Sequence, residues 1–141
     1  PFVAAFEDGL AKSKELMAVD ANNTDWLRDL SLTHSLIGDV HMRLGNVKGS
    51  VAAYLDGLAV ANRLTEINPG NAEWQWDLYV NYWRLADTGQ DTATYFQKAL
   101  DVIQGMQTKG LLSPSRTVWV ENTRQRLTEA MAADKGQAKA N

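Results

Sequence analysis

Two aspartates and two histidines are the polar residues whose spacing in this sequence could support chemistry. Asp29 and Asp77 each follow a tryptophan by three residues and lie 48 residues apart. Paired carboxylates can act in acid–base catalysis, but a catalytic pair has no reason to recur once per repeat, so we assign both a structural role. His34 and His41 lie seven residues apart, whereas histidines that bind metal on a helix are usually four apart with a third ligand near. We therefore expect no metal, no cofactor and no catalytic residue, and we predict that the protein is not an enzyme.

Aromatic side chains form the second candidate site. Residues 72–87, AEWQWDLYVNYWRLAD, contain three tryptophans and two tyrosines. Trp76, Tyr79 and Trp83 recur at spacings of three and four, which places them on one face of a helix with Val80 beside them. Such side chains bury a large area at low entropic cost and are favoured at interfaces. Two interpretations stay open: the three rings form a shelf for a partner, or the last helix of the chain covers them.

The elements that must position these residues repeat along the chain. Residues 4–11, AAFEDGLA, are identical to 52–59, AAYLDGLA, at six of eight positions, and 22–30 match 70–78 at the same offset of 48. Tyr54-x2-Gly57-Leu58 then matches Phe96-x2-Ala99-Leu100 at an offset of 42. A repeat of this length indicates a supersecondary unit that buries its apolar face by stacking on its neighbours.

Apolar residues at spacings of three and four, with cap and turn residues between them, predict six helices and no strand. Asn23 or Thr24 caps the first long helix, Gly45 ends it, and "NPGN" at 68–71 turns the chain into the next unit. The expected inward face of that helix consists of Trp26, Leu30, Thr33, Ile37, Val40 and Leu44. The expected helices cover about 2–18, 24–44, 48–67, 72–87, 91–108 and 114–132, with Ser113 and Pro114 opening the last. We expect one repeat domain over 1–133 and a flexible tail over 134–141.

These helix pairs resemble tetratricopeptide repeats, whose pattern is W-x2-L-G-x2-Y followed by small, aromatic, small-Leu and proline positions. Ile37-Gly38-x2-His41 stands for L-G-x2-Y, and Tyr54 with Gly57-Leu58 stands for the aromatic and small-Leu positions. Residues 68–78, NPGNAEWQWDL, are similar to a bacterial long-repeat variant of the family, which fits the period near 48. The resemblance implies an all-α helical-hairpin solenoid of about two and a half repeats plus a C-terminal capping helix.

The resemblance also implies a protein–protein interaction module, a scaffold or adaptor. In the family, the first helix of each pair lines a concave groove that holds a partner peptide or segment. The residues expected to line that groove here are Arg28, Ser35, Asp39, Trp76, Tyr79, Val80 and Trp83. The alternative is a self-assembly element, because residues 2–18 match only the second helix of a unit and leave Phe2, Phe6, Leu10 and Leu16 without a partner helix. A homo-oligomer through this half-repeat is the corresponding expectation.

The composition argues against several other classes of protein. A net charge of −3, a pI near 5.3 and the absence of a Lys/Arg run argue against nucleic-acid binding. No apolar run reaches about 18 residues, so we expect no membrane span. The absence of cysteine removes disulfides and cysteine-bound zinc; it fits cytoplasm and periplasm, of which we favour the cytoplasm. Because the chain begins at Pro1, we expect a piece of a longer protein or a processed chain.

Overall fold

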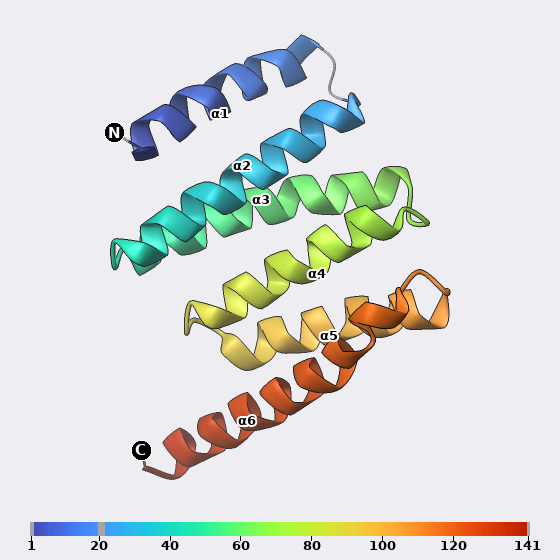
Figure 1. Ribbon diagram of the computed structural model, residues 1–141. Coiled ribbons are helices and arrows are strands. Elements are labelled where there is room, and N and C mark those ends of the chain that lie inside the picture. Colours follow the sequence, from blue (N-terminus) through green and yellow to red (C-terminus); the bar gives the residue numbers. More distant parts are fainter. Residues whose placement is uncertain (1, 20–21, 141) are drawn as a thin grey trace. The chain divides into compact units, whose positions relative to one another are not determined.

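The computed structural model describes residues 2–19 and 22–140 (Figure 1). Across these residues the chain is helical and contains no strand, which confirms the all-α fold class and the six helices. The elements are α1 (Phe2–Val19), α2 (Thr24–Arg43), α3 (Val47–Ile67), α4 (Ala72–Asp87), α5 (Thr92–Thr108), the short 3-10 helix η1 (Pro114–Arg116) and α6 (Val118–Ala140). The side chains of Phe2 and Leu16, two apolar residues expected in the first helix, lie outside the described part.

The helices form two compact units inside the region expected to be one repeat domain. Unit 1, Pro1–Pro69, contains α1, α2 and α3, and α2 packs against both of the others. Unit 2, Gly70–Asn141, contains α4, α5 and α6, and α5 packs against both of the others. Figure 1 shows the three helices of each unit running side by side. Each unit therefore has one central helix with a helix on either side.

Asparagines begin the helices at equivalent places of the repeat. The side chain of Asn23 accepts a hydrogen bond from the Trp26 backbone N–H at 3.2 Å, and Asn71 accepts one from Trp74 at 3.0 Å. These bonds satisfy a backbone donor that the first turn of a helix leaves unpaired. Gly45 has a φ of +74° directly after α2, where the left-handed conformation favours glycine. The predicted cap at Asn23 and the predicted helix end at Gly45 are both confirmed.

In unit 1 the pair α2–α3 is held together through small residues. A Cβ atom placed on Gly38 of α2 would lie 2.4 Å from the Tyr54 ring of α3, so the ring occupies the space that a side chain would need. The Tyr54 hydroxyl donates a hydrogen bond of 2.5 Å to the Asp39 carboxylate, and Ser31 donates one of 3.1 Å to the Gly57 carbonyl. The glycine at position 38 therefore allows the two helices a close approach.

In unit 2, the pair α4–α5 has different residue types at the equivalent positions. Ala86 and Phe96 stand in the registers of Gly38 and Tyr54, and both are 1% exposed within one apolar cluster. Phe96 has no hydroxyl, so Asp87, which is equivalent to Asp39, finds another partner. Its carboxylate lies 3.0 Å from the Arg126 guanidinium of α6. In unit 2, α6 thus supplies the polar partner of the aspartate, whereas in unit 1 the paired helix α3 supplies it.

The predicted inward face of α2 was correct at Leu30 and Ile37 and wrong at Leu44. Leu44 is 69% exposed because the helix ends at Arg43 and Leu44 is its C-cap residue. Trp26, Thr33 and Val40 are half-buried. The helix buries a wider arc than the apolar pattern indicates, because α2 packs against helices on two sides. The buried residues of α2 are Leu27, Leu30, Ser31, His34, Ser35, Ile37 and Gly38.

The last helix differs from the prediction at both ends. Pro114 opens a single 3-10 turn, in which the Ser113 side chain makes no capping hydrogen bond, and α6 proper begins at Val118. The helix then continues past the predicted end at residue 132 to Ala140, through the segment expected to be a flexible tail. Alanine, glutamine and lysine are good helix formers and account for most of this extension. Its side chains from Met131 onward are exposed.

Candidate functional site

Four of the predicted site residues lie together in unit 2, around a hollow of about 160 Å³. Trp76, Tyr79, Val80 and Trp83 come from α4, where spacings of three and four place them on one face of the helix. Trp119 from the first turn of α6 completes the lining. Since every lining side chain is aromatic or aliphatic, the hollow suits an apolar group.

Tyr79 forms the floor of this hollow and is 2% exposed. Its hydroxyl lies 2.7 Å from the Thr123 hydroxyl of α6, and Thr123 in turn lies 2.6 Å from the Trp119 carbonyl. Because Thr123 has one hydroxyl proton and gives it to that carbonyl, Tyr79 is the donor to Thr123. Burial raises the pKa of the Tyr79 phenol. The last helix, α6, therefore covers Tyr79, the innermost of the three aromatic rings on this face of α4.

Trp76 and Trp83 are only half-buried, and ring contacts hold them in place. The Trp83 ring meets Phe96 edge-on at a centroid distance of 5.0 Å and Trp119 edge-on at 5.7 Å. Trp76 lies 4.9 Å from Tyr79 in a tilted arrangement. Edge-to-face and tilted pairs at these distances are favourable for aromatic rings. The hollow is therefore a preformed surface whose outer walls reach solvent.

Two arginines border the hollow and lie over its tryptophans. The Arg116 guanidinium is 4.2 Å from the Trp76 ring centre and 3.4 Å from the Glu73 carboxylate. The Arg126 guanidinium is 5.4 Å from the Trp83 ring centre, in addition to its pairing with Asp87. Both ion pairs are partly exposed, so each contributes little to stability. Nothing in the sequence pattern indicated that Arg126 lies over an aromatic ring.

The three predicted site residues of unit 1 have separate surroundings. Arg28 is half-buried on α2. Ser35 is 5% exposed, and its hydroxyl donates a hydrogen bond of 3.2 Å to the Ser31 carbonyl one turn earlier. Ser35 was predicted on the groove face but lies in the interior, because a small side chain bonded to its own helix fits where helices pack closely. Asp39 is half-buried and accepts the Tyr54 hydroxyl.

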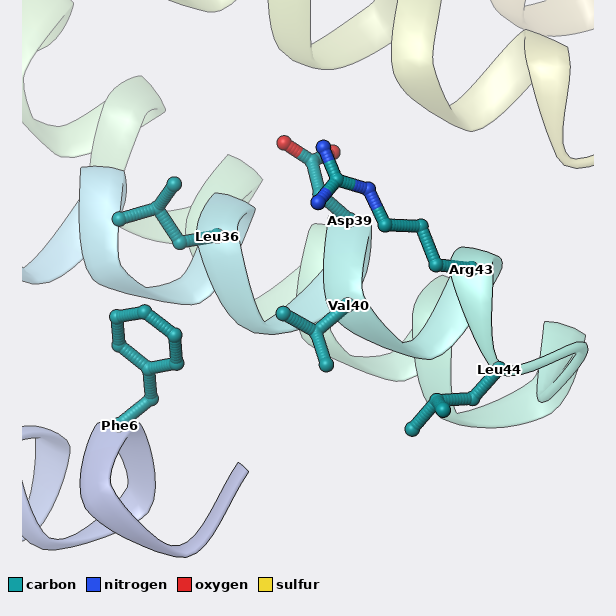
Figure 2. A pocket seen from close by; sticks show the side chains of 6 residues that line it. All are labelled: Phe6, Leu36, Asp39, Val40, Arg43 and Leu44. Atoms are coloured by element: carbon teal, nitrogen blue, oxygen red, sulfur yellow. The ribbon is translucent and has the colours of Figure 1, made fainter. Parts of the chain in front are cut away.

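Asp39 also lines a second pocket, of about 400 Å³, between α1 and α2 (Figure 2). Figure 2 shows the Phe6 ring of α1 directed toward Leu36 on α2, with Val40 farther along the same helix. Leu44 and Arg43 complete the lining at the end of α2. Sequence reasoning identified Phe6 as lacking a partner helix, but it placed Val40 and Leu44 on the inward face and did not find the pocket.

The histidines have different environments. His34 is 3% exposed, and burial lowers the pKa of its imidazole; nearby Asp56 opposes this shift and Lys14 adds to it. The Nδ1 atom of His41 lies 3.3 Å from the side-chain amide nitrogen of Asn46. Within residues 2–19 and 22–140, no three potential metal ligands gather at one place. None of the helices described there has the length and apolar character needed to cross a membrane.

Comparison with known proteins gives no relative for this chain. No protein-family model matches it, and no curated protein or solved structure is significantly similar.

Proposed function

We propose that this chain is a protein-interaction module built from tetratricopeptide-like helix pairs, which act as units of a solenoid. Two features support this proposal. The same two repeat positions pack together in both helix pairs. Gly38 faces Tyr54 in α2–α3, and Ala86 lies in one apolar cluster with Phe96 in α4–α5. The asparagine caps recur at the same offset as the sequence repeat. Such units bury their apolar faces through neighbours and present a continuous surface to a partner.

The observation that carries the proposal is the aromatic hollow of unit 2. Its volume of about 160 Å³ suits one large apolar side chain rather than a whole small-molecule ligand. Three tryptophans line it, and tryptophan is enriched among residues that dominate binding energy at protein interfaces. A partner segment would therefore place one leucine, methionine or phenylalanine side chain between Trp76, Trp83 and Trp119.

The two arginines specify the charge beside that apolar side chain. Arg116 and Arg126 already lie over the aromatic faces, so the hollow is poorly suited to a cationic group. Their present partners, Glu73 and Asp87, are partly exposed carboxylates that a partner's carboxylate can replace at small cost. The preferred segment therefore has acidic residues next to its apolar anchor, since opposite charges fix orientation and exclude wrong partners.

The test uses two synthetic peptides that differ in charge alone: a central leucine flanked by glutamates, and the same leucine flanked by lysines. Binding is followed through the tryptophan indole N–H signals in two-dimensional NMR. We expect the glutamate peptide to shift the signals of Trp76, Trp83 and Trp119, and the lysine peptide to bind at least about tenfold more weakly.

Two variants separate the hollow from the rest of the surface. Trp119→Ala removes one wall, and we expect it to weaken the glutamate peptide by about tenfold or more. Val118→Ala changes the adjacent residue, which is 57% exposed and does not line the hollow, and should leave binding unchanged. The proposal fails if both variants bind the peptide as the unaltered chain does, or if the lysine peptide binds more tightly.

A further inference from the structure

Unit 1 contains a further pocket, of about 270 Å³, that is lined by side chains from all three of its helices. Leu30 and His34 of α2 are each 3% exposed and form its floor. Pockets for drug-sized molecules hold about 300–1,000 Å³, so this one, which we call the His34 pocket, suits a smaller ligand. The remaining lining residues are Lys14 of α1 and Asp56, Ala59 and Val60 of α3.

His34 brings a polar ring to the floor of this pocket. Within the described part of the chain, no hydrogen bond involves its imidazole, although the residue is 3% exposed. Because burial lowers its pKa, the ring is neutral at pH 7 and has one nitrogen that can donate a hydrogen bond and one that can accept. Buried polar groups usually have a partner. The imidazole is therefore a point at which a ligand in the pocket can attach.

Unit 2 fills the equivalent place with its own side chains. Tyr82 stands in the register of His34 at the offset of 48, and Tyr95 stands in the register of Ala53 at the offset of 42. The two tyrosine rings stack with their centroids 6.5 Å apart. The Nζ atom of Lys98 lies 6.0 Å from one ring centre and 5.9 Å from the other. In unit 2, a stacked ring and a cation thus accompany the residue that is equivalent to the histidine.

Unit 1 has neither of these two groups. Ala53 has no ring to place beside His34, and Asp56 stands at the position where unit 2 has Lys98. A ligand can therefore supply the ring, and the charge next to that ring is reversed, so that it attracts a cation instead of being one. Lys14 adds a positive charge from α1. The His34 pocket thus offers a stacking partner for a ring together with one charge of each sign.

We propose that the His34 pocket binds a free α-amino acid with an aromatic side chain. The ring of the ligand lies against His34, its ammonium group pairs with Asp56, and its carboxylate pairs with Lys14. Both of these charged side chains are exposed, so the two ion pairs orient the ligand more than they add to its affinity. A phenylalanine inside a peptide carries neither charge, so the free amino acid fits better than a peptide segment.

This site is independent of the aromatic hollow and of the function proposed for it. The His34 pocket belongs to unit 1 and the hollow to unit 2, and they share no lining residue. The chain has two histidines, and His41 does not line the pocket. The carbon-bound ring protons of His34 therefore report on the pocket in two-dimensional NMR, and those of His41 serve as an internal control.

The first experiment compares four small molecules. Phenylalanine has the ring and both charges, phenethylamine lacks the carboxylate, 3-phenylpropionate lacks the ammonium group, and leucine lacks the ring. We expect phenylalanine to shift the His34 signals in a saturable way below about 20 mM and to leave His41 unchanged. Each of the two singly charged compounds should bind about two- to fivefold more weakly, as the loss of one exposed ion pair implies. Leucine should bind at least about threefold more weakly, because it cannot stack.

The second experiment changes the protein. Asp56→Asn and Lys14→Gln should each weaken phenylalanine about two- to fivefold. Their matched controls are Asp8→Asn and Lys12→Gln, which alter exposed residues of α1 outside the pocket and should bind as the unaltered chain does. Asp8 is equivalent to Asp56 in the repeat, at the offset of 48.

A third variant closes the pocket. Ala53→Tyr supplies the ring that unit 2 has at this position and should weaken phenylalanine at least about tenfold, with circular dichroism as the check that the chain stays helical. The absence of a saturable His34 shift with phenylalanine would overturn the proposal. So would leucine binding as tightly as phenylalanine, or Asp56→Asn and Lys14→Gln both binding it as their controls do.

Discussion

Replacing Gly38 by alanine tests directly whether helix packing in unit 1 depends on close approach. Three atoms of the Tyr54 ring would lie 2.4, 2.5 and 2.9 Å from the new Cβ, well inside van der Waals contact. The ring cannot move away cheaply, because it is 3% exposed and its hydroxyl is bonded to Asp39. Overpacking of this kind costs about 1–3 kcal/mol. Against this, alanine is favoured over glycine inside a helix by about 1 kcal/mol.

The matched control is Gly105→Ala in α5, where a Cβ would meet no atom within 4 Å. It gains the same helix propensity without the clash, so we expect it to stabilise the chain by up to about 1 kcal/mol. The difference between the two variants isolates the steric cost of about 1–3 kcal/mol, which corresponds to a difference in Tm on the order of 4–10 °C. Urea and thermal unfolding followed by circular dichroism measure both.

A double variant tests the cause. Tyr54→Phe removes the bond to Asp39 and lets the ring shift, so Gly38→Ala with Tyr54→Phe should cost less than the sum of the two single changes. If Gly38→Ala stabilises the chain as much as Gly105→Ala does, the ring is not confined and the packing argument is refuted.

Three further predictions concern single side chains. Tyr79→Phe should lower the free energy of unfolding by about 1 kcal/mol, as the loss of one buried hydrogen bond to Thr123 requires, and urea titration measures it. Trp83→Ala should cost about 2 kcal/mol or more by removing the edge contact with Phe96, whereas Trp83→Phe should cost distinctly less in the same titration. Because burial lowers the pKa of His34 below 6.5 in the folded chain, the unfolded chain binds that proton more readily. Stability should therefore be full above pH 6.5 and decline as the pH falls below it, and His34→Gln should flatten that decline in Tm measured across pH.

The sequence predicted the helices well because interactions between residues close together in the chain determine where a helix begins and ends. Asn23 and Gly45 act through hydrogen bonds and dihedral angles within a few residues, so the types of the residues alone reveal them. It failed where burial depends on several neighbouring helices. Ser35 looked like a surface residue because it is polar, yet it lies inside, and Leu44 looked like a core residue because it is apolar, yet it is exposed. Polarity and spacing do not report how many helices surround a position.

The sequence likewise predicted only part of the candidate site. The sequence grouped Trp76, Tyr79, Val80 and Trp83 because they share a face of one helix, and the structure gathers these four around one hollow. The other half of the hollow comes from a region about 40 residues later in the chain, where no repeat register exists to align it. Trp119, Thr123 and the arginines could be placed against α4 only once the packing of α6 was known.

Whether the last helix covers Trp76, Tyr79 and Trp83 has one answer for Tyr79 and another for the two tryptophans. Tyr79 is covered by α6 and held by a buried hydrogen bond, so its role is structural. Trp76 and Trp83 are braced by that covered ring and by Phe96, but they keep an outer surface beside Trp119. A covering helix and the binding surface that we propose are therefore compatible in this unit. By fixing the inner ring, α6 orders the two outer rings in advance, and such preorganisation lowers the entropic cost of the binding that we propose.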